Sequence, residues 1–169
     1  MTKLSQYVIG RLADWGVRHV FMVTGGGAMH LFAFVCPLLP LDANYAVGNF
    51  IRDAMAGGPV QIGGDSTPYR SYLYAADLSI WLWTLLMRGE SGADYNVGSP
   101  HEISIANLAR RVVEVAAPGA KIRIARQPVP GAPALRYVPA TDRAAGLGLR
   151  PWVSLEDGVR RTCEWQRRS

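Results

Sequence analysis

Three consecutive glycines, Gly25–Gly27, follow an apolar run, an arrangement typical of loops that bind phosphate. The chain becomes strand-like again at residues 32–35, which leaves no room for the helix whose N-terminus would hold the phosphate. The dinucleotide fingerprint G-x-G-x-x-G fails here because position 30 is His30, and the one other candidate fails because position 151 is Pro151. The sequence therefore contains no recognisable dinucleotide loop, which excludes a complete nucleotide-binding βαβ unit built on these glycines.

The composition is that of a folded domain. Apolar residues make up 49% of the 169 residues, enough for a real core. The best candidate for a membrane span, residues 78–87, is shorter than the roughly 18 residues that a span requires, so we expect no membrane partner. Polar residues interrupt the N-terminus, which is not typical of a secretory signal, and we expect a cytoplasmic protein.

The charge pattern disfavours a nucleic-acid partner. The net charge is +5, and arginine supplies 16 of the 18 basic residues, but they are scattered and form no basic stripe with interleaved aromatic residues. Arginine also suits the bidentate binding of a diphosphate. We expect no metal site, because the histidines and cysteines show no ligand spacing (His19, His30, His101, Cys36 and Cys163).

Hydrophobic periodicity predicts helices alternating with strands, which indicates an α/β fold. Helices are expected over residues 4–15, 49–56, 77–88, 104–116 and 154–167. Strands are expected over residues 19–23, 32–35, 60–62, 71–74, 95–98 and 121–125. Ser104 and Ser154 are the predicted N-caps of the last two helices, and residues 127–133 form a proline-rich loop.

From Phe32 onward the chain resembles the C-terminal half of NAD-dependent epimerases/dehydratases, which are extended short-chain dehydrogenases that modify nucleotide sugars. The resemblance is carried by "GNFIRDAMAGGPVQIGGDSTPYRSYLYAADLSIWLW", "YNVGSPHEISIANLARRV" and "LGLRPWVSLEDGVRRTCEW". One departure is Ser66, which follows Asp65 where the family has glycine. The resemblance implies a truncated extended short-chain dehydrogenase, namely the substrate-binding half with residual strands of the Rossmann sheet.

The N-terminal part resembles a different family. The stretch "KLSQYVIGRLADWGVRHVFMVTGGGAMHL" is similar to the first helix and strand of thiamine-diphosphate enzymes of the acetolactate-synthase type. This divides the chain into residues 1–31 and residues 32–169. We expect that a deletion joined two genes at about this point.

The resemblance also implies what the chain lacks. In epimerases/dehydratases the glycine motif holds NAD, and a tyrosine with a lysine four residues later transfers the proton. Lys121 would need a tyrosine at position 117, which is Ala117, and Lys3 has no residue four positions before it. We therefore expect no bound cofactor and no catalysis by this chain alone, although the family uses NAD.

The resemblance assigns five residues to a nucleotide-sugar site. Arg70 matches the arginine on the substrate's diphosphate, with a surface salt bridge as the alternative. Asn49 and Asn96 match polar positions near the substrate, with a helix N-cap and a structural turn as the respective alternatives. The stretch Val60–Gly64, which supplies Ile62 and Gly64 to these five, would flank the base.

Three functions stay open on this basis. The chain is an inactive remnant of a nucleotide-sugar epimerase or 4,6-dehydratase. Alternatively, it is a module that binds a nucleotide-diphosphate sugar, or a half-enzyme whose partner chain supplies the Rossmann half. The third is a non-functional product of gene fusion.

Overall fold

The structure is a computed structural model that describes Asp14 and residues 45–168. The helix expected over residues 4–15 lies outside this part, apart from Asp14, which is helical. The strands expected over residues 19–23 and 32–35, and the junction at residues 31 and 32, also lie outside it. The resemblance to thiamine-diphosphate enzymes therefore stays a prediction.

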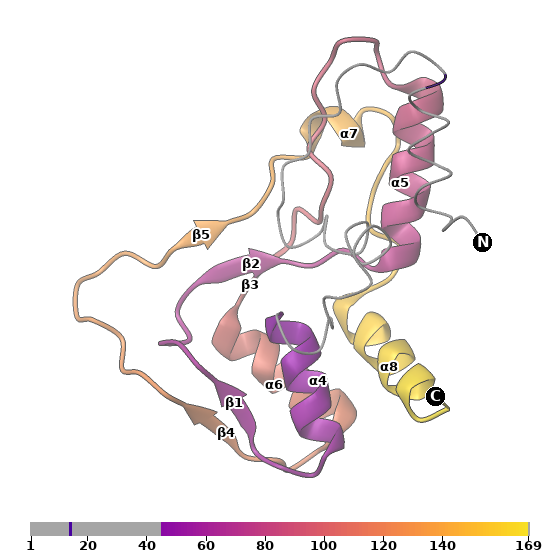
Figure 1. The fold of residues 1–169 in the computed structure, drawn as a ribbon. Helices are drawn as coiled ribbons and strands as arrows, with labels where there is room; N and C mark the ends of the chain where they lie inside the picture. The colour runs from indigo at the N-terminus through magenta and orange to yellow at the C-terminus, as the bar shows by residue number, and fades with distance from the viewer. Residues whose placement is uncertain (1–13, 15–44, 169) are drawn as a thin grey trace.

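A first layer joins two short parallel strands to three helices (Figure 1). The strands are β1 (Val60–Ile62) and β4 (Ile122–Ile124), with Val60 opposite Ile122. The helices are α4 (Ala46–Met55), α6 (Ile105–Ala116) and α8 (Leu155–Gln166). Their apolar faces form one buried cluster that includes Phe50, Val60, Leu108, Val112 and Val159.

A second sheet has the strand order β3-β2-β5. Strand β2 (Tyr69–Ser71) runs antiparallel to β3 (Glu102–Ser104) and parallel to β5 (Arg136–Tyr137). Arg136 of β5 forms an ion pair with Glu102 of β3, and its guanidinium carbon lies 5.9 Å from the centroid of the Tyr69 ring. These contacts link the two outer strands, β3 and β5, across the central strand β2.

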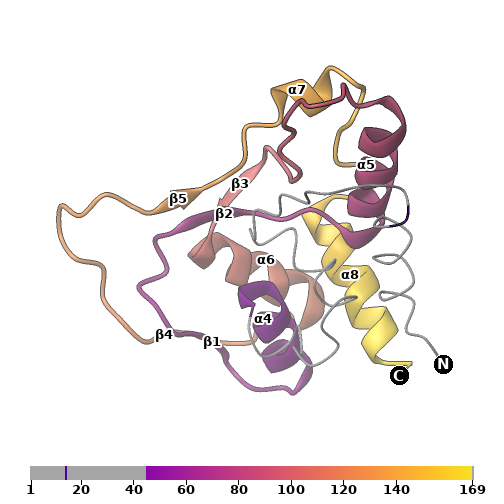
Figure 2. The same cartoon turned by 45° about the horizontal axis from the view of Figure 1, so that its top comes forward.

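A third group contains α5 (Ala75–Arg88) and the short α7 (Asp142–Ala145), which pack around a second apolar cluster. Trp81 is 1% exposed there, and its indole nitrogen donates to the carbonyl oxygen of Arg150 at 3.3 Å. The segment between β4 and β5 leaves the body of the molecule as an extended arm (Figure 2). No helix among the described residues is both long and apolar enough to cross a bilayer.

The two serines predicted as N-caps, Ser104 and Ser154, cap helices α6 and α8. The Ser104 hydroxyl accepts from the backbone N–H of Asn107 at 3.2 Å, and the Ser154 hydroxyl accepts from that of Asp157 at 3.1 Å. Each bond satisfies one of the N–H groups that a helix leaves free at its start. Both cap predictions are confirmed.

Several predicted boundaries are wrong. The strand expected over residues 71–74 is β2 (Tyr69–Ser71), two residues earlier, because pairing with β3 and β5 fixes its register. Residues 95–98 form no strand, because no described residue pairs with their backbone. Strands β3 and β5 and helix α7 were not expected, because segments of two to four residues carry no measurable periodicity.

Among the described residues, Ser66 is the one non-glycine residue with a positive φ, at 67°. This is the position where the resemblance calls for glycine, and a side chain in the left-handed region costs roughly 1–2 kcal/mol. Glycine also gains entropy in the unfolded chain, which offsets part of that relief. We therefore expect Ser66→Gly to raise the free energy of unfolding by about 0.5–1 kcal/mol. Urea denaturation measures it, and an unchanged or lower value would contradict the strain argument.

Candidate functional site

A hollow of about 260 Å³ lies where α4, the end of β1 and the start of α6 meet. Because β1 and β4 are parallel, their carboxyl ends lie at one edge, and ligands of α/β folds bind outside such edges. The lining is mostly apolar and small. It consists of Ala46, Asn49, Phe50, Gln61, Ile62, Gly63, Gly64, Ser66, Pro68 and Ile105.

Three of the five predicted site residues line this hollow, namely Asn49, Ile62 and Gly64. Asn49 lies within α4 and not at its N-cap, which is Tyr45, so the capping alternative is wrong. Helix α4 begins three residues before the expected start. The Asn49 side-chain oxygen accepts from Arg52 at 3.2 Å, which leaves the amide N–H groups as its donors for a ligand.

Arg70 lies outside the hollow, on β2. Pro68, two residues before it, is part of the lining, so the strand leads from the hollow to the arginine. The guanidinium is half-buried and donates to the carbonyl oxygen of Tyr69 at 2.8 Å. No carboxylate of the described residues forms an ion pair with it, so the salt-bridge alternative finds no support in this part of the chain.

Tyr72 lies two residues after Arg70 in the chain and packs against the first core. Burial raises the pKa of its phenol to about 12, although the charge of Arg70 opposes the shift. Because the folded-state pKa is above the ordinary value of 10.0, the neutral phenol favours folding below pH 10. That contribution is lost as the pH rises through 12.

We therefore expect the free energy of unfolding to fall by roughly 2–3 kcal/mol between pH 10 and pH 12 because of Tyr72. Tyr72→Phe should remove this part of the pH dependence, because phenylalanine has no proton to lose. Urea denaturation at both pH values measures it, with the exposed Tyr137→Phe as the control. Equal pH slopes in the parent chain and Tyr72→Phe would contradict the assignment.

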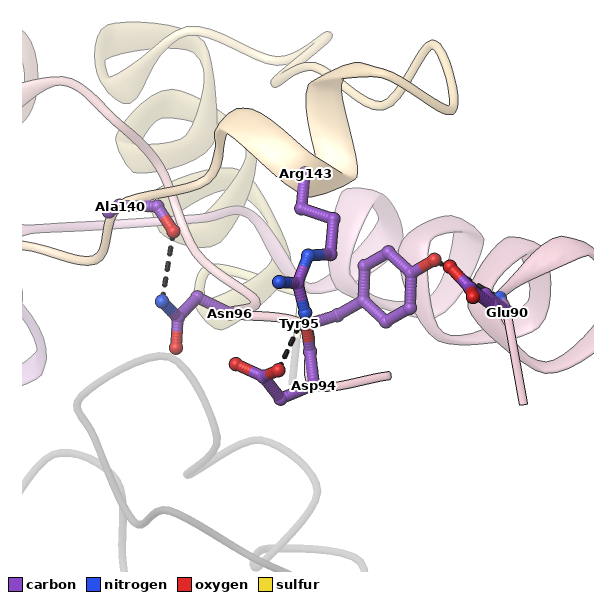
Figure 3. A network of polar contacts seen from close by, with 6 residues as sticks. All are labelled: Glu90, Asp94, Tyr95, Asn96, Ala140 and Arg143. Atoms are coloured by element: carbon purple, nitrogen blue, oxygen red, sulfur yellow. Dashed lines mark hydrogen bonds and ion pairs between the residues drawn. The ribbon is translucent and has the colours of Figure 1, made fainter. Parts of the chain in front are cut away.

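Asn96 belongs to a different group of polar contacts (Figure 3). Its side-chain nitrogen donates to the carbonyl oxygen of Ala140 at 2.9 Å. Arg143 of α7 donates to the backbone and side-chain oxygens of Asp94, each at 2.6 Å, and both lie on the surface. This ion pair lowers the pKa of Asp94 and raises the pKa of Arg143. The structure therefore supports the structural alternative for Asn96, which does not line the hollow.

Sequence reasoning did not select Ser66, Pro68 or Ile105 for the hollow, whereas Gln61 belongs to the stretch Val60–Gly64 that was expected to flank the base. Ser66 and Pro68 belong to the "VQIGGDSTP" stretch, so their proximity to Ile62 and Gly64 in the sequence was an available signal. Ile105 comes from a segment about 40 residues further along and had none. Arg126 was also missed, and its backbone N–H donates to the carbonyl oxygen of Gly64 at 3.3 Å, at the rim of the hollow.

The turn after β1 differs from a dinucleotide-binding turn. Gly63 and Gly64 follow a parallel strand, as phosphate-binding glycines do, but the chain continues into β2 and not into a helix. This turn therefore does not itself begin a helix whose N-terminus could hold a pyrophosphate.

The described part of the chain has the α/β fold of extended short-chain dehydrogenases of the epimerase and dehydratase type. One solved neighbour is an epimerase from Methanothermobacter thermautotrophicus, with a TM-score of 0.63 and 25% identity, covering 74% of this chain and 38% of that one. The expected fold class is confirmed.

Curated relatives point to the same enzymes. UDP-glucuronic acid decarboxylase 4 of Arabidopsis thaliana is 32% identical over 123 residues, which are 73% of this chain and 27% of the relative. The dTDP-D-glucose 4,6-dehydratase of Mus musculus is 30% identical over 113 residues, 64% of this chain and 32% of the relative. The chain thus spans about a third or less of the length of these two relatives. No protein-family model matches the chain.

Proposed function

We propose that this chain binds a nucleoside diphosphate sugar, with the nucleoside in the hollow and the diphosphate at Arg70. The observation that carries the proposal is that Asn49 of α4 lines the same hollow as Ile62 and Gly64, which belong to a separate stretch at the end of β1. The names of the relatives, which act on UDP- and dTDP-linked sugars, support this ligand class.

The chemistry of the hollow suits a nucleoside. A largely apolar wall formed by Phe50, Ile62 and Ile105 favours the faces of a flat base, and Asn49 and Gln61 offer polar groups to its edges. Gly63 and Gly64 leave open space, because a Cβ on either would meet no protein atom within 4 Å. Backbone groups of this turn are therefore accessible to a ligand.

A cationic site completes the proposal. The diphosphate carries negative charge, and a half-buried guanidinium without a carboxylate partner in the described part is suited to bind it through two parallel hydrogen bonds. Arg126, at the rim next to Gly64, offers a second cation.

We further propose that the chain performs no oxidation or reduction by itself. Its 169 residues contain neither the glycine fingerprint nor a tyrosine–lysine pair with the required spacing. A half-enzyme that acts with a dinucleotide-binding partner chain remains the second candidate. It rests on the resemblance of residues 32–169 to the half of these enzymes that binds the nucleotide sugar.

Calorimetric titration with UDP-glucose and dTDP-glucose tests the proposal. We expect saturable binding to the parent chain and weaker binding to Gly64→Val, whose side chain would take up room at the rim of the hollow. Because open space surrounds that position, the variant should keep its stability. NADH, followed by its fluorescence, should show no saturable micromolar binding.

Two results would contradict the proposal. If neither nucleotide sugar binds, this result supports the hypothesis that the chain is a non-functional product of gene fusion. If Gly64→Val binds as tightly as the parent, the ligand does not occupy this hollow.

A further inference from the structure

Buried polar side chains usually have a hydrogen-bond partner within the fold. Five polar residues of the described part of the chain are buried, namely Ser66, Asp77, Ser99, Ser104 and Thr141. The side chains of Asp77, Ser99 and Ser104 accept backbone N–H groups, so each of them holds a neighbouring segment in place. The hydroxyls of Ser66 and Thr141 form no hydrogen bond with a described residue. Of these two residues, Ser66 lines the hollow.

The turn between β1 and β2, which contains Ser66, separates two hollows (Figure 1). Ser66 lines the first hollow, of about 260 Å³, whereas Asp65 and Thr67 line a second one, of about 200 Å³, beside the extended arm. No fully buried side-chain oxygen or nitrogen of the described residues lacks a hydrogen-bond partner, so the unpartnered Ser66 hydroxyl must be accessible. Because Ser66 itself is only 9% exposed, a molecule in the first hollow is well placed to reach this hydroxyl.

The backbone at position 66 gives no reason for a serine. Its φ of 67° lies in the region that favours glycine. Backbone contacts fix the turn, since the carbonyl oxygen of Ser66 accepts from the N–H of Ala106 at 3.0 Å and that of Gly64 accepts from Arg126 at 3.3 Å. A glycine at position 66 would make the same carbonyl contact without the strain. The side chain therefore serves another purpose than holding the turn.

Backbone strain is often retained where a side chain has a function, and the hollow indicates which one. A base that enters the hollow exchanges its hydration for walls that are mostly apolar, so its polar edge needs partners from the protein. The side-chain oxygen of Asn49 already accepts from Arg52. A serine hydroxyl both donates and accepts, so Ser66 suits a carbonyl oxygen as well as an N–H group of a base.

We propose that Ser66 is a ligand-binding residue whose hydroxyl forms a hydrogen bond with the nucleoside, and that the chain retains it although it lowers stability. This inference rests on the proposed function, in which the hollow holds the nucleoside. It predicts opposite signs for one substitution. Ser66→Gly should make the chain more stable and its ligand binding weaker, whereas a serine with a role in folding alone would not affect binding in this way.

Calorimetric titration with UDP and UDP-glucose tests the inference, together with urea denaturation without ligand. Ser66→Ala removes the hydroxyl and keeps the strained Cβ, and Ser66→Gly removes both. We expect each variant to bind both ligands roughly two- to tenfold more weakly, as the loss of one neutral hydrogen bond predicts. The two ligands should lose affinity equally, because they share the nucleoside. Without ligand, Ser66→Ala should be about as stable as the parent and Ser66→Gly more stable.

The matched control is Thr141→Val, which removes the other buried hydroxyl that has no partner in the described part of the chain. Thr141 is the N-cap of α7 and lines neither of the two hollows. Valine has nearly the shape of threonine, so only the hydroxyl is lost. The affinity for UDP and UDP-glucose should therefore equal that of the parent.

The inference alone is overturned if both Ser66 variants bind as tightly as the parent while Gly64→Val still weakens binding. It is also overturned if Thr141→Val causes the same loss, or if UDP-glucose loses affinity and UDP does not, which would place the hydroxyl at the sugar. A less stable Ser66→Ala without ligand would show that the hydroxyl has a partner within the protein, which contradicts its role for a ligand. If the parent chain binds neither compound, the proposed function fails and this inference fails with it.

Discussion

Replacing Asp77 with alanine is expected to lower the free energy of unfolding by about 3–5 kcal/mol, a large fraction of the roughly 5–15 kcal/mol that is typical of folded domains. The carboxylate is 1% exposed, and one of its oxygens accepts the backbone N–H groups of Trp152 and Val153, each at 3.0 Å. The alanine variant leaves both N–H groups without this partner. Each hydrogen bond to a charged acceptor is worth roughly 1.5–3 kcal/mol.

Urea denaturation measures this loss, and two variants make it specific. Asp77→Asn keeps an oxygen acceptor without the charge, so its loss should lie between those of the parent and alanine. Asp142→Ala removes another carboxylate from the first turn of a helix, α7, but an exposed one, and should cost less than about 1 kcal/mol. Similar losses for Asp77→Ala and Asp142→Ala would show that the buried contacts with Trp152 and Val153 contribute little.

Replacing Arg70 with alanine is expected to weaken the binding of a nucleoside diphosphate sugar roughly ten- to a hundredfold. A charge-assisted bidentate contact is worth about 1.5–3 kcal/mol, and about 1.4 kcal/mol corresponds to one decade in affinity. Arg70→Lys should recover only part of the affinity, because an ammonium group cannot reproduce the planar fork.

Calorimetry with the nucleotide sugar that binds the parent chain most tightly provides the comparison. Arg167→Ala, at the end of α8, is the control and should cause only a small, salt-dependent loss. Equal affinity of Arg70→Ala and the parent would show that the diphosphate is not bound at β2. A loss for Arg126→Ala in its place would move the cationic site to the rim of the hollow.

Elements that depend on neighbours in the chain could be predicted from the sequence. Helices α5, α6 and α8 follow from apolar residues at helical spacing, and two of them start at the expected serines. Periodicity and capping act over three or four residues, so the sequence alone contains them. The α/β class followed from the predicted alternation of helices and strands. The resemblance of the chain to epimerases/dehydratases followed from motifs that occur in the order typical of that family.

The candidate site was predicted in part. Ile62 and Gly64 lie in one short stretch and Asn49 follows from the resemblance, and all three line the hollow. Asn96 was assigned from the same resemblance, but its side chain donates to the carbonyl oxygen of Ala140 and does not line the hollow. A motif matches residue types and does not specify which side chains face one another. The lining by Ile105 depends on how α6 packs against α4.

Tertiary structure alone decided the rest. Residues 95–98 have a strand-like sequence but no strand, whereas β3 and β5 have weak signals and are strands, because a strand exists only where another backbone pairs with it. Asp77 and Trp81 belong to one apolar helix, and only contacts with a segment some 70 residues away distinguish their roles. Which side of α5 is buried and which is exposed is equally a result of packing, since both sides are apolar in the sequence.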